Sequence, residues 1–273
     1  PDFEANVARL TALAGEMLDA TCALNNRLDL GRLCTWGRWQ APPDLRTEDA
    51  PAGHICYDVI RRAENDVLLI PDLPSSRYAE SDPNVRAYGL QTYVGHVVRC
   101  GGTPVGSLCV VYQRTFVPTE EDRRLLGILA AALGREELRR RGDEAVRQSE
   151  TRLATIISSA RDSIFLKDPG LRYTLVNPAM AALLGRPAAE LLGKSDAELF
   201  GPAAAAHSAE VDRRVLAGEV VEEETEKPVN GVPRIFHTVK VPLRGPDGRA
   251  TGLCGVARDI TERKQAEAAL RAS

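Results

Sequence analysis

The sequence predicts an α+β protein of two domains, each an antiparallel sheet flanked by helices, joined by a long helical linker. Its 273 residues exceed the usual length of one domain, which is about 100–200 residues. Two blocks of paired strand-like segments alternate with helical patterns, and a charged helical stretch separates the blocks. Hydrophobic residues make up 44% and charged residues 27% of the chain, as in ordinary globular proteins.

The first domain is predicted over residues 1–140. Its helices are recognised by apolar residues at steps of three and four, and its hairpins by apolar runs around short Gly-containing turns. The predicted elements are a helix over 2–19, a hairpin over 21–40, a helix over 54–65, a strand over 67–73, a loop-rich stretch with a short helix over 75–90, and a hairpin over 93–115.

Residues 141–160 are predicted to form a helical coiled-coil linker. A long helix begins after Pro118, with Thr119 as its N-cap, and turns polar around Gly142. Apolar or small residues then resume a 3-4-3-4 spacing at Val146, Ser149, Leu153, Ile156 and Ala160. We therefore expect a homodimer through the helices of 119–160 and of the C-terminus.

The second domain is predicted over residues 161–262, and residues 263–273 begin a C-terminal signalling helix that Thr261 caps. Turn residues again separate the apolar runs. The predicted elements are a strand pair around the turn at 168–170, three short helices within 178–200, a helix over 203–218, and strands over 220–228, 232–244 and 250–260.

Charge and cysteine content limit the possible functions. The net charge is −3, so the chain has no general positive field and nucleic acid is not an expected partner. The sequence contains no run of about 18 apolar residues, so no membrane-spanning segment is predicted. The six cysteines have no zinc-ligand spacing, so we expect no metal and a reducing, cytoplasmic location.

The two ends of the chain resemble internal boundaries. The sequence begins without Met and stops within a helical pattern, and AVRQSE at 145–150 is echoed by ALRAS at 269–273. Because the first copy leads into the second domain, we expect the second copy to lead into a further module beyond Ser273, either another sensor or an output domain.

These segments resemble two known families. The first domain resembles a GAF domain. The central strand, hairpin and closing helix of that family correspond to VLLIPDLP, YGLQTYVGHVVRCGGTPVGSLCVV and FVPTEEDRRLLGILAAAL. The second domain resembles a PAS domain that passes into its signalling helix. The resemblance lies in IFLKDPGLRYTLVNPAMAALLGRPAAELLGKSDAELF and VPLRGPDGRATGLCGVARDITERKQAEAAL. The resemblance implies the sensory region of a bacterial signalling protein, of the histidine kinase (two-component) or cyclic-di-GMP enzyme type. It also implies a role in signal relay for Asp259 and Thr261.

No catalytic residues are predicted. The sequence lacks the phosphate-loop, zinc-protease and dinucleotide motifs, and it lacks the phosphoacceptor-histidine and GGDEF-like signatures of the expected outputs. One enzyme alternative is a GAF-type methionine sulfoxide reductase, because Cys100 and Cys109 flank the hairpin turn. Buried packing explains those cysteines better, since the cysteine pattern of that enzyme is not reproduced.

No cofactor is identified. Flavin photochemistry is disfavoured because GKSDAELF has no cysteine, bilin attachment because Tyr57 follows Cys56, and haem because the residues around His207 do not match haem-binding relatives. Lys240 is expected to be a surface or rim cation, with binding of a ligand carboxylate as the alternative. The candidate pocket residues are His54, Cys56, His96, Cys109, Phe165, Asn177, His207, Phe236, His237 and Cys254.

The predicted function is therefore sensory. A small molecule or a protein partner would bind and change the packing of the linker and C-terminal helices, which would bias the output domain. A ligand-free dimerisation scaffold is the first alternative, and the reductase is the second.

Overall fold

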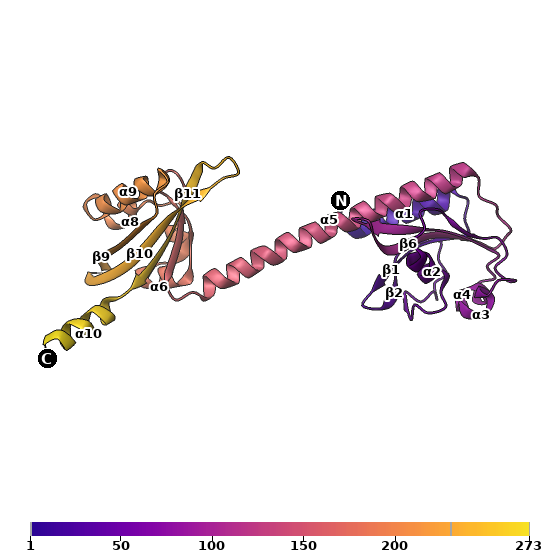
Figure 1. Cartoon of the computed structure of the whole chain (residues 1–273), viewed down its shortest axis with the longest axis horizontal. Helices are drawn as coiled ribbons and strands as arrows, with labels where there is room; N and C mark the ends of the chain where they lie inside the picture. Colours follow the sequence, from indigo (N-terminus) through magenta and orange to yellow (C-terminus); the bar gives the residue numbers. More distant parts are fainter. Residues whose placement is uncertain (1, 230, 273) are drawn as a thin grey trace. The chain divides into compact units, whose positions relative to one another are not determined.

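The computed structural model describes residues 2–229 and 231–272, and the chain divides after Arg147 into two compact units. The first unit is built on a six-stranded antiparallel sheet in the order β3-β2-β1-β6-β5-β4 (Figure 1). Its strands are β1 (Cys22–Asp29), β2 (Arg32–Trp39), β3 (Glu48–Asp49), β4 (Leu68–Ile70), β5 (Thr92–Cys100) and β6 (Thr103–Tyr112). Its helices are α1 (Phe3–Met17), α2 (Ile55–Arg62), α3 (Tyr78–Ser81), α4 (Pro83–Ala87) and the first part of α5 (Glu120–Ser159).

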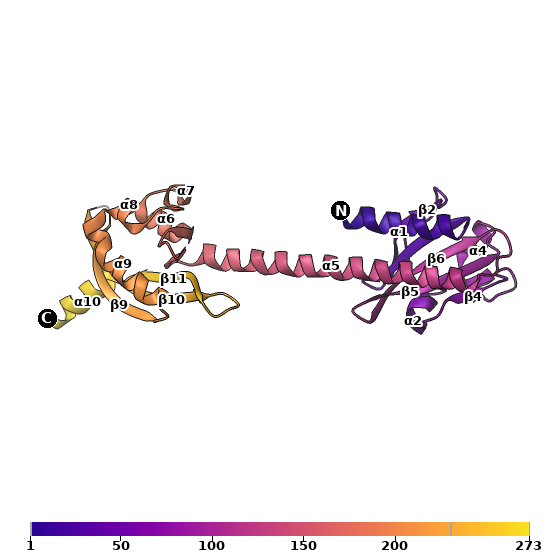
Figure 2. The same cartoon turned by 90° about the horizontal axis from the view of Figure 1, so that it is seen from above.

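Alternation along the strands creates two hydrophobic layers in this unit. On β5, Val94 and Val98 face a core shared with α1 and α5, whereas Tyr93 and Val97 face a core shared with α2, α3 and α4. Figure 2 shows α1 and the first part of α5 lying together over the sheet. The predicted helices and hairpins of this unit are confirmed. The two-residue β3, which pairs with β2, was not predicted because it is too short to show a period.

Helix α5 is continuous over 40 residues, so Gly142 does not interrupt it. The expected N-cap is confirmed, because Thr119 Oγ1 accepts from the Asp122 amide at 3.2 Å and Asp122 accepts from the Thr119 amide at 2.8 Å. The first half packs on the sheet through buried residues that include Leu126 and Leu133. The expected domain boundary at 140/141 lies inside this helix.

The second unit has a five-stranded antiparallel sheet in the order β8-β7-β11-β10-β9. Its strands are β7 (Ser163–Lys167), β8 (Tyr173–Val176), β9 (Val221–Val229), β10 (Val232–Arg244) and β11 (Ala250–Asp259). Its helices are α6 (Pro178–Leu184), α7 (Ala188–Leu191), α8 (Asp196–Phe200), α9 (Pro202–Leu216) and α10 (Thr261–Ala272). The core joins α6 and α9 to the sheet through residues such as Phe165, Met180 and Val211.

The start of α10 differs in one detail from the expectation. Thr261 is the first residue of the helix, and its hydroxyl accepts a hydrogen bond from the Ile235 amide at 2.9 Å. It therefore fastens α10 to β10 instead of capping the helix. Asp259 Oδ1 accepts from the Thr261 amide at 2.9 Å.

Two glycines of α5 provide a test of its packing. A Cβ on Gly134 would lie 2.0 Å from the carbonyl oxygen of Arg99 on β5, whereas a Cβ on Gly142 would meet nothing within 4 Å. We expect Gly134→Ala to destabilise the chain by about 1–3 kcal/mol through overpacking. Gly142→Ala should stabilise it by up to about 1 kcal/mol through helix propensity. Urea unfolding of both variants measures this, and equal stability of Gly134→Ala and the wild type would contradict the packing.

Candidate ligand-binding site

A cavity of about 250 Å³ lies in the second unit, between the inner face of the sheet and helices α6, α8 and α9. One part of its wall is apolar and comprises Phe165, Met180, Leu183, Leu184, Phe200 and Phe236. The other part is polar and comprises Ser163, Lys167, Tyr173, Asp196, Ser208, Glu226, Lys227, Thr238 and Lys240. An apolar cavity with a few convergent polar groups is the usual form of a small-molecule site.

The strand period explains which residues reach the cavity. Phe165 and Lys167 are two apart on β7, so their side chains point to the same face of the sheet. The same holds for Phe236, Thr238 and Lys240 on β10, all of which are buried. Each strand therefore contributes aromatic and cationic groups to one wall.

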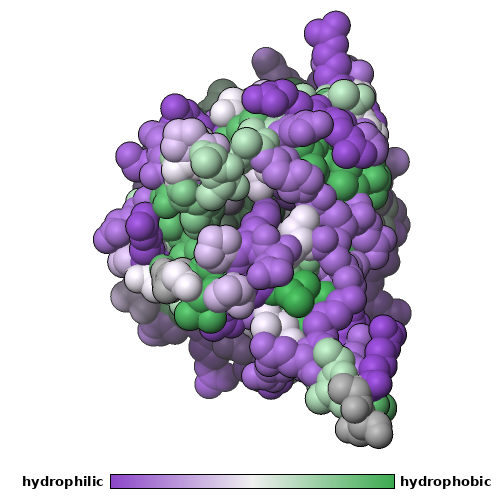
Figure 3. Space-filling model, turned by 90° about the vertical axis from the view of Figure 1, so that its left-hand side faces the viewer, coloured by the Kyte–Doolittle hydropathy of each residue, from purple (hydrophilic) through white to green (hydrophobic). Residues whose placement is uncertain are grey.

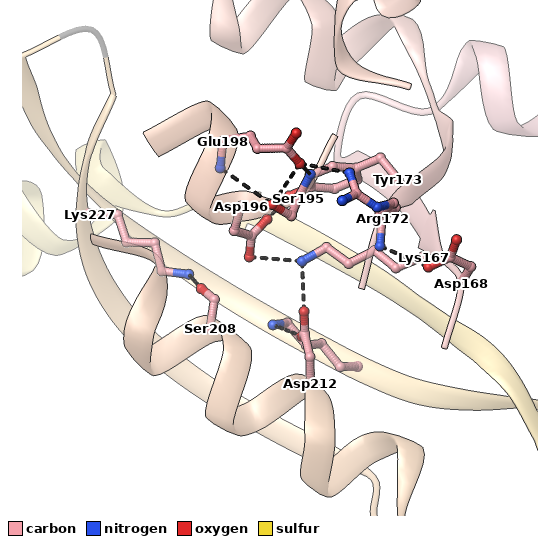
Figure 4. A network of polar contacts seen from close by, with 11 residues as sticks. Lys167, Asp168, Arg172, Tyr173, Ser195, Asp196, Glu198, Ser208, Asp212 and Lys227 are labelled. Carbon is pink, nitrogen blue, oxygen red and sulfur yellow. Dashed lines mark hydrogen bonds and ion pairs between the residues drawn. The ribbon is translucent and has the colours of Figure 1, made fainter. Parts of the chain in front are cut away.

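Two of the three cavity lysines, Lys167 and Lys240, are neutralised by two buried aspartates (Figure 4). Lys167 Nζ donates to Asp196 Oδ2 at 2.8 Å and to Asp212 Oδ2 at 2.6 Å. Lys240 Nζ donates to the other oxygen of Asp212, and the Tyr173 hydroxyl donates to the other oxygen of Asp196. The side chains of Lys167 and Asp212 are each 1% exposed, so this network of two cations and two anions lies inside the fold.

Burial and charge act against each other at Asp196. Burial alone would raise the pKa of this carboxyl, but the charge of Lys167 and the hydrogen bonds from Lys167 and Tyr173 outweigh it and lower the pKa. Burial and the neighbouring Asp196 raise the pKa of the Tyr173 hydroxyl well above its ordinary value. Asp196 is therefore held ionised and Tyr173 is held as a hydrogen-bond donor.

The cavity adjoins a second hollow of the same unit. The residues that line both spaces are Leu184, Phe200, Ala204, Pro228 and Val229. Figure 3 views the end of the second unit and shows hydrophobic residues gathered on one part of a mostly hydrophilic face. Phe200, which lines both spaces, is 42% exposed. A ligand could enter between α8, α9 and β9.

The first unit has a smaller cavity of about 80 Å³, the volume of roughly three water molecules. Cys56 and Cys109 line it, and their sulfur atoms lie 3.6 Å apart. Asn26 and Tyr93 also contact Cys56 Sγ, at 3.1 and 3.5 Å. The Cys109 hydrogen bond lowers the pKa of Cys56 to about 7 despite burial, and the same contact raises the pKa of Cys109.

Four of the ten predicted pocket residues line these cavities: Phe165 and Phe236 in the second unit, and Cys56 and Cys109 in the first. Phe165 and Phe236 come from different strands, which the sheet brings together on one face. Cys109 pairs with Cys56 on α2 and not with Cys100. Cys100 belongs to the hydrophobic core on the other face of the sheet. Cys100 and Cys109 lie on the paired strands β5 and β6 and are both buried, as predicted.

The two histidines of the first unit do not line the small cavity. His54 is buried between two carboxylates, with Nδ1 3.4 Å from Asp82 and Nε2 3.6 Å from Asp49, and the hydrogen bond with Asp82 raises its pKa despite burial. His96 lies on the opposite face of β5 from Tyr93, and its Nε2 is 3.2 Å from the Asn65 carbonyl oxygen. His54 therefore does not reach the small cavity. His96 lines a second hollow of this unit, about 200 Å³ in volume, between β5 and α5, as its predicted pocket position requires.

The remaining candidates of the second unit also lie outside its cavity. Asn177 is buried as the N-cap of α6, where it accepts from the Met180 amide at 3.0 Å. Cys254 lies on β11 opposite Val241, on the sheet face away from the cavity.

His207 and His237 each pair with a glutamate of β9, at 2.9 Å from Glu223 and 2.7 Å from Glu222. His237 follows Phe236 directly on β10, so the two side chains point to opposite faces, and only Phe236 reaches the cavity. The exposed Glu222 and Glu224 agree with a solvated strand edge, while Glu223 faces inward.

The expectation for Lys240 as a surface cation is wrong, because this lysine is 3% exposed and paired with Asp212. Sequence reasoning also missed Lys167, Asp196, Asp212 and Tyr173. One signal was available, because Lys167 shares the inward face of β7 with Phe165. A lysine on an inward face requires an acidic partner, but the spacing does not identify which one.

No cluster of three or more potential metal ligands occurs among residues 2–229 and 231–272. Within the same ranges, no helix combines the length and apolar character needed to cross a bilayer.

The chain thus contains two helix-flanked antiparallel sheets with a long helix between them in sequence, and the second unit encloses a cavity lined by polar and apolar residues. A GAF-domain model matches residues 2–136, and a PAS-fold model matches residues 157–265. The chain is thus a GAF domain followed by a PAS domain.

Two curated relatives are histidine kinases or sensor proteins. The methanogenesis regulatory histidine kinase FilI of Methanothrix harundinacea is 44% identical over 125 residues, which cover 45% of this chain and 14% of FilI. The aerobic respiration control sensor protein ArcB of Escherichia coli is 31% identical over 126 residues, which cover 45% of this chain and 16% of ArcB. The match therefore spans only a small part of each relative.

Among solved structures, the PAS domain of BvgS from Bordetella pertussis is 25% identical, with a TM-score of 0.38, and the match covers 45% of this chain and 95% of that domain. A domain of a sensory box histidine kinase/response regulator from Geobacter sulfurreducens is 26% identical, with a TM-score of 0.36. That match covers 42% of this chain and 96% of the solved chain.

Removal of one aspartate tests the charge network. Asp212→Asn leaves Lys167 and Lys240 with only one carboxylate between them, so we expect a loss of about 3–5 kcal/mol in the free energy of unfolding. Glu210→Gln, which removes an exposed negative charge from the same helix, should change it by less than about 0.5 kcal/mol. Urea denaturation measures both, and similar effects of the two substitutions would argue against a buried network.

Proposed function

We propose that this chain is the sensory part of a signal-transduction protein, in which the PAS domain binds a small molecule and passes the signal to an output domain through α10. The observation that carries this proposal is that strand β10 both lines the cavity and is hydrogen-bonded to the start of α10. Phe236 lines the cavity, and its neighbour Ile235 accepts from the Ile260 amide at 2.8 Å and donates to Thr261. A ligand that moves Phe236 would therefore act on the start of α10.

The junction between β11 and α10 supports the proposed relay role of Asp259 and Thr261. One oxygen of Asp259 accepts from Thr261, and the other accepts from Arg234 at 2.5 Å. These hydrogen bonds join the end of β11 to β10 and to the start of α10. Such a junction lets a small displacement of the sheet tilt or rotate the helix.

We also propose a homodimer through α5 and α10. Val146, Leu153 and Ile156 are each more than half exposed on α5, and their spacing of seven and three residues forms one stripe. On α10, Leu270 is 84% exposed. Pairing with a second copy would bury these apolar groups.

The PAS cavity is the proposed sensor site, because it combines about 250 Å³ with an apolar wall and several convergent polar groups, whereas the GAF cavity beside Cys56 and Cys109 has only about 80 Å³. We propose that the chain works by binding and not by catalysis, and that an output domain follows it. A histidine kinase output is supported by the name of FilI, and a cyclic-di-GMP enzyme remains the second possibility. The six free cysteines support a cytoplasmic location.

A screen tests ligand binding and relay together. The full chain is screened by thermal unfolding against a library of small metabolites, and hydrogen exchange is measured with any compound that stabilises it. We expect slower exchange at the cavity strands and changed exchange in α10. Ala204→Trp, at the cavity mouth, should abolish the stabilisation. Binding without any change in α10 would refute the relay, and no stabilising compound would favour the ligand-free scaffold.

A charge within the α5 stripe tests the dimer. Leu153→Glu should convert the dimer to a monomer, because it places a charge in the apolar seam. Thr155→Glu introduces the same charge on the opposite side of the helix and should leave the dimer intact. Sedimentation of the full chain measures the mass, and a wild-type monomer would refute this interface.

A further inference from the structure

Lys227 on β9 differs from the other two lysines of the PAS cavity. It lines the cavity wall, and its Nζ donates to the hydroxyl of Ser208 on α9 at 2.7 Å (Figure 4). Among the described residues, no carboxylate forms an ion pair with it, whereas Lys167 and Lys240 both pair with Asp212. An ammonium has three donors, so Lys227 offers further hydrogen bonds to a ligand.

None of the neighbouring carboxylates forms an ion pair with Lys227 among the described residues. Glu226, the preceding residue on β9, is exposed at the edge of the cavity, and Glu223 Oε1 is buried without a hydrogen-bond partner. Asp196 accepts from Lys167 and Tyr173, and both oxygens of Asp212 accept from lysines. Glu223, which faces inward from the same strand as Lys227, pairs with His207 at 2.9 Å. Lys227 is therefore the cavity cation whose charge is not matched by a paired anion.

Burial makes this unmatched charge costly. Loss of hydration lowers the pKa of the Lys227 ammonium, and the nearby charge of Lys240 adds to the effect. A bound anion would reverse both effects. A charge-assisted hydrogen bond in such a site is roughly twice as strong as a neutral one.

The rest of the cavity selects the body of the ligand. Phe165, Met180, Leu184 and Phe236 supply an apolar wall, and the volume of about 250 Å³ is below the roughly 300–1,000 Å³ of drug-sized pockets. We infer that the PAS cavity binds a small monocarboxylate with an apolar body, whose carboxylate is held by Lys227 Nζ and the Ser208 hydroxyl. This inference rests on the proposed ligand-binding function of the same cavity.

Matched pairs of acids and amides test the inference. Phenylacetate, 3-phenylpropionate and octanoate are titrated into the full chain by calorimetry, each beside its primary amide, which has nearly the same shape but no charge. We expect at least one acid to bind at least about tenfold more tightly than its amide. Lys227→Met should abolish that difference and leave amide binding unchanged, because it keeps the apolar stem and removes the charge.

Two further variants complete the design. Lys194→Met removes an exposed lysine of the same domain and should leave acid binding unchanged. Ser208→Ala removes only the hydroxyl partner and should weaken acid binding by about three- to tenfold, which provides a test even if Lys227→Met does not fold.

The possible failures are distinguishable. Equal affinity of acid and amide, or no effect of either Lys227→Met or Ser208→Ala on an acid that binds, would overturn the carboxylate inference and leave the cavity as a ligand site. Binding of none of the acids or amides would overturn the inference. If the metabolite screen also yields no ligand, the proposed sensor function fails as well.

Discussion

The neutralisation of charge inside the PAS core constrains the rest of that domain. Lys167 comes from β7, Lys240 from β10, Asp196 from α8 and Asp212 from α9. A buried charge without its partner costs several kcal/mol, so these four elements must keep one arrangement for all the charges to be paired. The network thus holds α8 and α9 against the sheet by polar contacts, beside a space that side chains do not fill. The cavity is a consequence of this arrangement.

The GAF domain is packed differently. Its sheet is covered on both faces, and the space beside Cys56 and Cys109 has the volume of roughly three water molecules. Gly134 of α5 approaches β5 closely, beside a hollow of about 200 Å³ that β5 and α5 line together. The two domains therefore divide the expected tasks. The PAS domain offers a cavity with a lysine that has no paired carboxylate, whereas the sheet of the GAF domain supports the first part of α5, the helix that precedes the PAS domain in sequence.

The hydrophobic pattern of the sequence predicted the helices and strands that are long enough to show a period of 3.6 or 2 residues. The helix expected over 203–218 is observed as Pro202–Leu216, and the strand expected over 232–244 is observed with those bounds. Phe236 and His237 were both predicted to line a pocket, although neighbours on a strand point to opposite faces, and only the helices over one face of the sheet show that Phe236 is the one that does. The two-residue β3 has no period, and its pairing with β2 depends on the loop that brings it there.

The sequence by itself determined the two-domain α+β architecture, the order of GAF and PAS domains, and the long helix between them, because these follow from periodicity and from motifs of contiguous residues. Only the tertiary structure decided which lysine is neutralised. Lys167 and Asp212 are 45 residues apart, and Lys240 and Asp212 are 28 apart. No local spacing encodes such contacts. The structure therefore moved the candidate anion site from Lys240, which is paired inside the core, to Lys227, which is not.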